Sequence, residues 1–212
     1  ENVITTGDAF HCDIIVSETS AQKTLLGWQS GLPGFHNVEN ATAALAACFA
    51  LPGLSEEDLR RGVNSYRGAK RRFEYVIKTA EHIVIDDYAH HPQELNAIIG
   101  SVRALYPGRP ITGVFQPHLF TRTRDFADGF AESLDKLDIP ILLNIYPARE
   151  LPIPGITSDW LMEKMVNPNR KRMENADVIE YIKETKPSLL LVLGAGDIDR
   201  LVPVIKDIYH EI

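Results

Sequence analysis

The sequence is poor in cysteine and has no long apolar run. Cys12 and Cys48 are the only cysteines among 212 residues, and they lack the spacing of metal ligands. Two free thiols in a reducing compartment are the simpler interpretation, with a disulfide as the alternative. No apolar run approaches the ~20 residues of a membrane-spanning helix, and no signal peptide begins the chain. These absences predict a protein of a reducing compartment without a membrane partner.

The chain also has no excess of positive charge. Its 22 Lys and Arg face 29 Asp and Glu, which gives a net charge of −7. This balance argues against wholesale binding to nucleic acid, although a local cationic pocket is compatible with it. The apolar share of 44% is that of an ordinary globular protein. Because the opening residues look like the middle of a protein, we expect a fragment of a longer cytoplasmic chain.

The first part of the chain mixes short strands with helices. An alanine-rich helix is expected over about 37–50. Ser55, followed by two glutamates, is typical of a helix N-cap, and its helix runs to about residue 64. Two short strands that suit a hairpin are expected at 10–16 and around 25–28.

A basic loop at 66–72 separates this part from the rest, and we place a domain boundary there. Residues 1–71 then form one domain and residues 72–212 another. Beyond the loop, strands are expected at 73–78, 82–86, 111–115, 139–144 and 189–193. Helices are expected at about 93–106, 124–137, 158–165, 175–184 and 197–209. Continuous apolar strands with right-handed crossovers predict a three-layer, Rossmann-like α/β domain with a mostly parallel sheet.

The most informative segment is Asp86-Asp87-Tyr88-Ala89-His90-His91-Pro92. It follows an apolar strand and precedes a helical pattern, and ligands of parallel sheets lie at the carboxyl ends of strands. A carboxylate and an imidazole there can hold a metal, orient an amine or move a proton. We therefore assign function to Asp87 and His90. For Tyr88 and His91, function and local packing are both open, and Asp86 alternatively caps the helix.

A second polar segment, Phe115 to Asp125, also follows a strand. Its two arginines suit a carboxylate or phosphate clamp, because the guanidinium forms paired hydrogen bonds to such groups. We favour function for Arg122. For Arg124 we favour the simpler interpretation, that it begins a solvated helix with Asp125.

Three further segments carry weaker signals. Asn37 and Asn40 fall on one face of a helix, where one can cap it and an amide can match the edge of adenine. Arg71 and Arg72 either neutralise a phosphate or form a solvated face. The turn Gly194-Ala195-Gly196-Asp197 lacks the third glycine of a dinucleotide fingerprint, so we interpret it as a tight turn with Asp197 as helix cap.

Taken together and in order, these motifs resemble those of the Mur ligases. They are 34–41, 71–74, 86–92, 115–118, 121–125 and 194–197. The resemblance covers nearly all 212 residues. Within the family, the combination is most similar to the ligases that join L-alanine to UDP-N-acetylmuramate in peptidoglycan precursor synthesis.

The resemblance implies a fold and a reaction. Mur ligases have a UDP-binding domain, a central ATPase domain and a Rossmann-like third domain. Residues 1–71 resemble the end of the central domain, and residues 72–212 resemble the third. ATP and Mg²⁺ would serve the full-length enzyme, which phosphorylates the muramate carboxylate before the alanine amine attacks the acyl phosphate. The family's Gly-x-Gly-Lys-Thr/Ser loop is absent from this sequence, so we expect the fragment alone to be inactive.

The resemblance also implies a role for each site residue. The implied nucleotide-binding residues are Asn37, Asn40, Arg71 and Arg72. The implied catalytic residues, at the junction of nucleotide and amino acid, are Asp87 and His90. The implied substrate-binding residues are Tyr88, His91, His118 and Arg122. Among these, Arg122 would hold the alanine carboxylate, and no residue of the chain is implied as a metal ligand. Many relatives have arginine after the Pro-His pair, where this chain has Leu119.

Other functions are alternatives. A recycling ligase attaches a whole tripeptide to the same nucleotide, but the 115–118 and 121–124 motifs favour the alanine-adding enzyme. A non-catalytic homologue that binds a nucleotide or an amino acid is a second alternative. A dinucleotide-dependent oxidoreductase is disfavoured by the incomplete glycine fingerprint.

Overall fold

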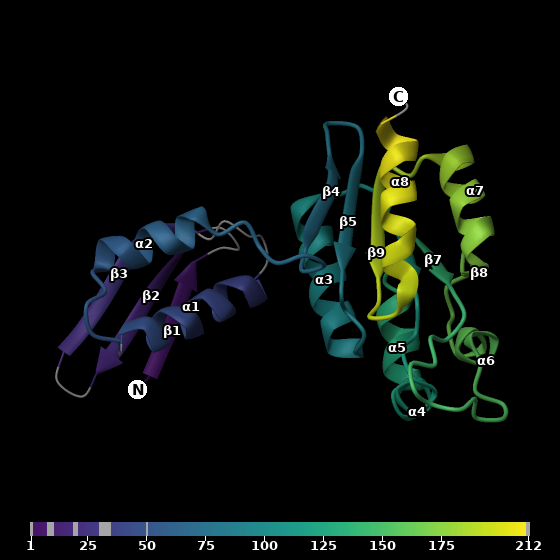
Figure 1. Ribbon diagram of the computed structural model, residues 1–212, viewed down its shortest axis with the longest axis horizontal. Helices are drawn as coiled ribbons and strands as arrows, with labels where there is room; N and C mark the ends of the chain where they lie inside the picture. Colours follow the sequence, from purple (N-terminus) through teal and green to yellow (C-terminus); the bar gives the residue numbers. More distant parts are fainter. Residues whose placement is uncertain (1, 8–10, 19–20, 30–34, 50, 211–212) are drawn as a thin grey trace. The chain divides into compact units, whose positions relative to one another are not determined.

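The computed structural model describes the chain at residues 2–7, 11–18, 21–29, 35–49 and 51–210, with side chains at 40–48 and 51–210. The chain divides into two compact units, Glu1–Ala69 and Lys70–Ile212. Figure 1 shows the two units in the colours of the sequence. None of the helices in the described ranges is long and apolar enough to cross a membrane.

The first unit contains an antiparallel sheet and two helices. Its strands, in the order β1-β2-β3, are Asn2–Gly7, His11–Glu18 and Ala21–Gln29. The expected hairpin is therefore β2–β3, whereas β1 was not expected. Its helices are α1 at Phe35–Phe49 and α2 at Glu56–Ser65. Residues 10 and 50, expected ends of a strand and a helix, lie outside the described residues.

Local chemistry explains the start of α2. The Ser55 hydroxyl accepts from the backbone N–H of Asp58 at 3.2 Å, and the Asp58 carboxylate accepts from the Ser55 backbone. This reciprocal pair is a capping box, so the predicted N-cap is confirmed. Cys48, on α1, is a free thiol.

The second unit is built on a six-stranded sheet with the order β4-β5-β9-β6-β7-β8. Its strands are Glu74–Lys78, Ile83–Asp87, Thr112–Phe115, Ile139–Leu142, Lys171–Arg172 and Leu189–Leu193, numbered β4 to β9 in chain order. Only the β4–β5 pair among these six strands is antiparallel. The mostly parallel α/β sheet predicted from the sequence is confirmed.

Helices cover both faces of this sheet, as Figure 1 shows. They are α3 at Pro92–Leu105, α4 at Phe120–Asp125, α5 at Ala127–Leu134, α6 at Ser158–Glu163, α7 at Asn175–Thr185 and α8 at Leu201–His210. The sheet has a hydrophobic core on each face, and successive residues of β5 belong alternately to one core and the other. Ile83 and Ile85 pack with α3 and α5, and Val84 packs with α7 and α8. Period-two alternation thus produces the three layers.

The helix boundaries differ from the expectation in two places. The single helix expected at 124–137 is two helices, α4 and α5, which are separated at Phe126, a residue with non-helical backbone angles. The helix expected from 197 begins with a 3₁₀ turn at Asp197–Arg200, and α8 follows it. The two-residue strand β8 was not expected at all.

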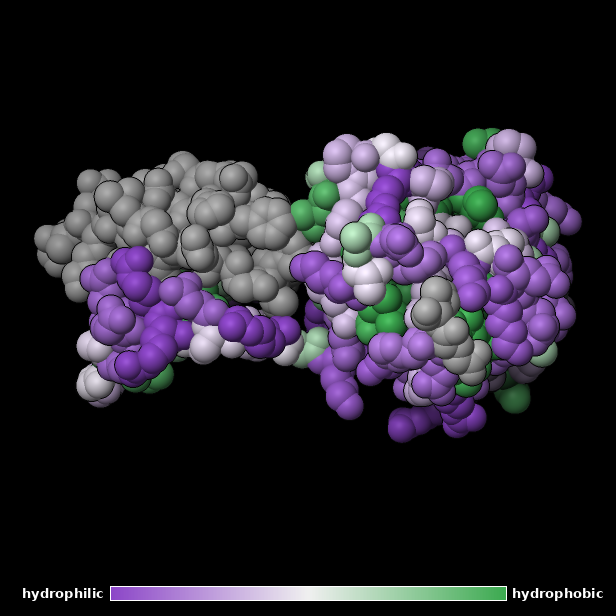
Figure 2. All heavy atoms as spheres, turned by 90° about the horizontal axis from the view of Figure 1, so that it is seen from above, coloured by the Kyte–Doolittle hydropathy of each residue, from purple (hydrophilic) through white to green (hydrophobic). Residues whose placement is uncertain are grey.

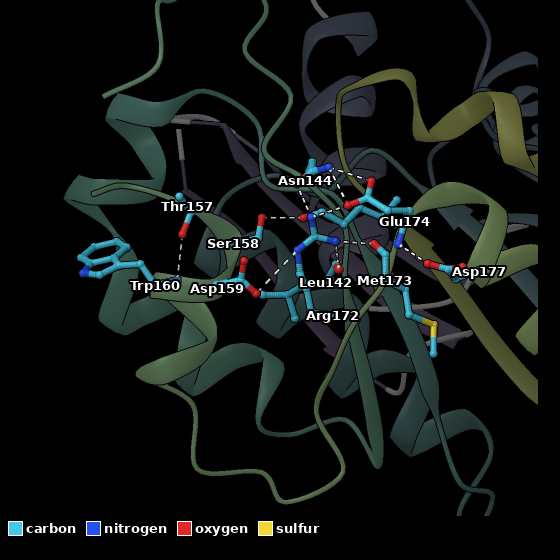
Figure 3. Close-up of polar contacts among 11 residues, drawn as sticks. Leu142, Asn144, Thr157, Ser158, Asp159, Trp160, Arg172, Met173, Glu174 and Asp177 are labelled. Carbon is cyan, nitrogen blue, oxygen red and sulfur yellow. Dashed lines mark hydrogen bonds and ion pairs between the residues drawn. The ribbon is translucent and has the colours of Figure 1, made fainter. Parts of the chain in front are cut away.

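Arg172 fixes this short edge strand to its neighbour. Its guanidinium donates to the Asn144 side chain and, at 2.9 Å, to Glu174, while Asn144 donates to Glu174 at 2.7 Å. Figure 3 shows these side chains converging from the ends of β7 and β8. Asp159 adds a further carboxylate at 4.0 Å from Nε. With its charge balanced by carboxylates, Arg172 is a structural connection rather than an anion site.

The surface at the amino ends of the parallel strands is mainly polar. Figure 2 views the second unit from the end that carries the β4–β5 turn, and hydrophilic residues dominate there. Hydrophobic residues form small, separate patches among them. The polar segments that the sequence places after β5 and β6 lie at the other end, where the parallel strands finish.

Candidate functional site

The candidate site lies where three neighbouring parallel strands, β5, β9 and β6, end. Backbone hydrogen bonds hold the three following loops together. The Gly194 N–H donates to the Asp87 carbonyl at 3.2 Å, and the Gln116 N–H donates to the Leu193 carbonyl at 3.0 Å. The two polar segments singled out in the sequence therefore lie on either side of the turn that follows β9.

The Asp87 carboxylate faces the backbone. One oxygen accepts from the Phe73 N–H at 2.7 Å, and the other accepts from the Ala89 N–H at 2.8 Å. The residue is 8% exposed. These bonds tie the loop after β5 to the segment that enters β4, so Asp87 contributes to the site first through the shape of this loop.

Asp86 pairs with Arg71 on the same edge. The Arg71 Nε lies 3.4 Å from an Asp86 carboxylate oxygen. Burial raises the pKa of Asp86 to about 6, against the opposing effect of the Arg71 charge. The alternative in which Asp86 caps the next helix is wrong, because His91 occupies the N-cap position.

Arg71 is occupied by protein groups. Its guanidinium donates to the carbonyls of Gly194 and Gly196, and it lies 3.8 Å from an Asp199 oxygen. Arg72 is exposed, and its guanidinium lies over the Tyr88 ring at 5.6 Å. Of the two arginines, Arg72 is therefore the one that faces solvent.

The segment around Arg71 has an uncommon backbone. Arg71 and Phe73 have φ angles of 58° and 50°, a region that residues with a Cβ rarely adopt. Glu74 accepts from the Arg71 N–H at 2.8 Å, and the Arg71 carbonyl accepts from the Tyr88 N–H at 2.7 Å. Together with the Asp87–Phe73 bond, these contacts fix the strained conformation.

Four aromatic rings gather beside this segment. The His90 ring meets Tyr88 edge-on at 5.2 Å and His118 at 6.1 Å, and His118 stacks on Tyr146 at 5.6 Å. His90 Nδ1 lies 2.9 Å from the Tyr88 carbonyl. Because a carbonyl only accepts, Nδ1 is the donor in this contact, so Nε2 is an acceptor whenever the ring is neutral.

His118 and Arg122 bring unsatisfied donors and acceptors to this group. The His118 Nδ1 and the Arg122 Nη1 are buried, and neither has a hydrogen-bond partner within the described part of the chain. Burial lowers the pKa of His118, and the nearby charges of Arg122 and His90 lower it further. A buried guanidinium nitrogen without a partner fits an incoming carboxylate.

Arg124 behaves differently from Arg122. It is half exposed and pairs with the neighbouring Asp125 at 2.7 Å. Arg124 is thus solvated, as expected, but it lies in the last turn of α4 rather than at the start of a helix. The two arginines do not form a clamp.

The structure does not bring every expected site residue to this group. The His91 side chain accepts from the Gln93 N–H at 3.4 Å, and its ring packs edge-on against Phe126 at 4.6 Å, so it serves α3 locally. Asn40 is exposed on α1 of the first unit. The side chain of Asn37 lies outside the described residues.

Gln116 connects the loops after β6 and β9, a role that sequence reasoning missed. Its amide donates to Asp197 at 2.8 Å, and its oxygen accepts from the Ile198 N–H at 2.9 Å. A Cβ on Gly196 would overlap both the Gln116 oxygen and Tyr146. Packing around Gly196 thus explains the tight turn. The expected cap is wrong, because Gly196 is the N-cap residue and Asp197 accepts a hydrogen bond from Gln116 instead.

The fold and the site define a Rossmann-like α/β domain with imidazole and guanidinium groups at the carboxyl edge of its sheet. The family model described as the Mur ligase, glutamate ligase domain matches residues 71–198. The chain belongs to the Mur ligase family.

Curated relatives are similar over most of this chain. The UDP-N-acetylmuramate–L-alanine ligase of Flavobacterium johnsoniae is 51% identical over 181 residues, which are 85% of this chain and 40% of the relative. The enzyme of the same name from Porphyromonas gingivalis is 50% identical over 183 residues, with 86% and 40% covered. The chain thus spans about two fifths of the length of these relatives.

Solved structures share the fold. The UDP-N-acetylmuramate-alanine ligase MurC from Thermotoga maritima matches 98% of this chain and 45% of its own, with a TM-score of 0.77 and 23% identity. A murein peptide ligase from Psychrobacter arcticus matches with a TM-score of 0.64 and 19% identity, covering 95% of this chain and 43% of its own.

Proposed function

We propose that this chain is the C-terminal part of an ATP-dependent ligase that joins L-alanine to UDP-N-acetylmuramate. Two relatives that carry this name are about half identical to it over most of its length. Because the chain spans only 40% of each, the activity belongs to the full-length protein. The reaction would take place in the cytoplasm, as expected for nucleotide substrates of this kind.

The proposed division of labour follows the two units. Residues 1–71 form the end of the central ATP-binding domain, and residues 72–212 form the third domain. The separation of compact units after Ala69 and the family match from residue 71 support this division. Asn37 and Asn40 would then contact adenine, and the exposed Arg72 would contact the nucleotide phosphates. Arg71, which backbone carbonyls and Asp86 hold in place, would lie behind Arg72 and support its contact with the phosphates.

The observation that carries the proposal is the buried, unpartnered Arg122 nitrogen beside His118 and His90. Arg122 would bind the carboxylate of L-alanine, and Tyr88 and His118 would line the pocket. The free Nε2 of His90 would accept a hydrogen bond from the alanine amine. Asp87 would keep this loop at the junction of nucleotide and amino acid. His91 would support it through α3.

These roles suit the chemistry of amide formation. The muramate carboxylate takes a phosphoryl group from ATP, the amine attacks the acyl carbon, and phosphate leaves. Holding the amine in line supplies much of the acceleration, and fixed cations stabilise the developing negative charge. Exclusion of water from the site would also keep the acyl phosphate from hydrolysis.

Magnesium would assist by neutralising phosphate charge. No group of three or more His, Cys, Asp or Glu side chains that could hold a metal ion occurs among the described residues. In this proposal the ion would be held with ATP elsewhere in the full-length enzyme.

The test uses the full-length protein encoded by the gene. ADP formation should require both UDP-N-acetylmuramate and L-alanine, and it should fall at least about tenfold at subsaturating L-alanine in Arg122→Ala but not in Arg124→Ala. The 212-residue chain alone should show no turnover. Absence of alanine-dependent turnover in the full-length protein contradicts the proposal. Faster turnover with a tripeptide than with alanine would instead identify the recycling ligase.

A further inference from the structure

The turn between His118 and α4 is strained. Leu119 has φ 72° and ψ 133°, a combination that is nearly restricted to glycine. This residue stands directly between His118 and the helix that carries Arg122. A strained residue in this place needs contacts that hold it. Those contacts also fix the orientation of the His118 and Arg122 side chains.

Backbone contacts from the loop after β7 hold the turn on one side. The Leu119 N–H donates to the Tyr146 carbonyl at 2.9 Å, and the Tyr146 N–H donates to the Pro117 carbonyl at 2.8 Å. Thr123 supports the other side, because its N–H and hydroxyl donate to the Leu119 carbonyl at 3.1 and 2.8 Å. Through Tyr146, the start of the proline-rich loop at 145–157 thus packs against the turn and the His118 ring.

Glu150, in the same loop, binds the start of α4. One carboxylate oxygen accepts from the Thr121 N–H at 3.0 Å, and the other accepts from the Thr121 hydroxyl. Leu119, the N-cap residue, makes no side-chain cap bond. A side chain 29 positions away in sequence therefore satisfies the first turn of α4.

The negative charge of Glu150 also acts on the site, through its effect on His118. Its bonds to Thr121 lower the pKa of the Glu150 carboxyl, so it stays ionised. The carboxylate opposes the effects of burial, Arg122 and His90, which all lower the pKa of His118. Arg122 and His90 thus lower the pKa of His118, and the negative charge of Glu150 raises it.

We propose that Glu150 is a positioning residue for amino-acid binding, which holds the strained turn so that His118 and Arg122 face the substrate carboxylate. The inference rests on the proposed function and extends it to a residue outside the recognised motifs. Glu150 itself contacts Thr121 and acts through the two side chains that the turn places.

The test compares Glu150→Ala with Glu150→Gln in the full-length ligase. The alanine variant should raise the KM for L-alanine about tenfold or more, change kcat less than about threefold, and leave the KM values for ATP and UDP-N-acetylmuramate unchanged. Glutamine should restore the KM to within about threefold, because its oxygen accepts from the Thr121 N–H and its amide donates to the hydroxyl. Glu184→Ala, on the exposed face of α7, is the matched control.

Other outcomes separate the alternatives. An unchanged KM for L-alanine in Glu150→Ala, or equal changes in all KM values, overturns the inference, and so does a glutamine variant as defective as the alanine variant. If Glu150→Ala does not fold, Thr121→Val removes only the hydroxyl bond and should raise the same KM by a smaller factor. Amide hydrogen exchange at Thr121 and Thr123 should be faster in Glu150→Ala than in wild type. This readout is independent of turnover, so failure of the proposed function and failure of this inference remain distinguishable.

Discussion

The Arg71 guanidinium lies 3.4 Å from the Asp86 carboxylate, and both side chains are largely buried at the end of β5. The pair joins the segment that enters β4 to the carboxyl edge of the sheet. A carboxylate that is buried beside a single guanidinium, with other carboxylates near it, is held in its charged form at a cost. Its titration therefore affects stability.

The first prediction concerns this titration. Asp86 has a pKa of about 6 in the folded protein against an ordinary value of 3.8. Between these values the folded state binds more protons than the unfolded state, so this group lowers the free energy of unfolding as pH rises from about 4 to about 6. Above about pH 6 the effect levels off. Urea unfolding at several pH values should show that Asp86→Asn lacks this component. Parallel stability curves for the two proteins would contradict it.

The second prediction concerns Asp87. Asparagine has a single acceptor oxygen, so Asp87→Asn leaves one of the Phe73 and Ala89 N–H groups without an acceptor. We expect the free energy of unfolding to fall by about 2 kcal/mol. Asp207→Asn, on the exposed face of α8, should change it by less than about 0.5 kcal/mol. Equal stabilities of the two variants in chemical denaturation would show that the Asp87 bonds do not hold the loop.

The third prediction contrasts two glycines. Gly196→Ala should lower the free energy of unfolding by at least about 1 kcal/mol, because the new methyl group meets Gln116 and Tyr146. Gly100→Ala, in the exposed middle of α3 with open space around it, should raise it by about 0.5–1 kcal/mol. Thermal unfolding measures both. Tolerance of alanine at 196 would mean that the turn has room that the packing does not indicate.

The fourth prediction concerns Arg172. Arg172→Ala removes the donors to Asn144 and Glu174 and should lower the free energy of unfolding by about 2 kcal/mol. Arg172→Lys should recover less than half of this loss, because an ammonium group cannot reproduce the planar fork. If lysine restores full stability, charge alone accounts for the connection between β7 and β8.

The sequence predicts the sheet of the second unit well where its strands contain short, continuous apolar runs. The runs at Ile83–Ile85 and Leu189–Leu193 lie in the buried centre, where pattern and burial coincide. β8 escapes prediction because its two residues, Lys171 and Arg172, are charged, and side-chain bonds of Arg172 hold it. The break at Phe126 escapes as well, since neither proline nor glycine marks it.

The candidate site is predictable only where it follows strand ends. His90 and His118 lie in the loops after β5 and β6, and Arg122 lies on α4, which follows the second loop. Their proximity therefore follows from the parallel sheet. Gln116 and Glu150 act through partners 81 and 29 positions away, and no local pattern records such a contact. The roles of the site residues themselves stay predictions until the variants are measured.

The position of β9 has a consequence for how the protein is made. β9 is the last strand along the described residues, yet it lies between β5 and β6 at the middle of the sheet. During synthesis, the backbone bonds that β9 and its following turn make to both loops cannot form until residue 194 has been added. A stop codon before residue 189 would therefore remove the strand that pairs with both β5 and β6, and with it the backbone bonds that hold the loops after these strands together.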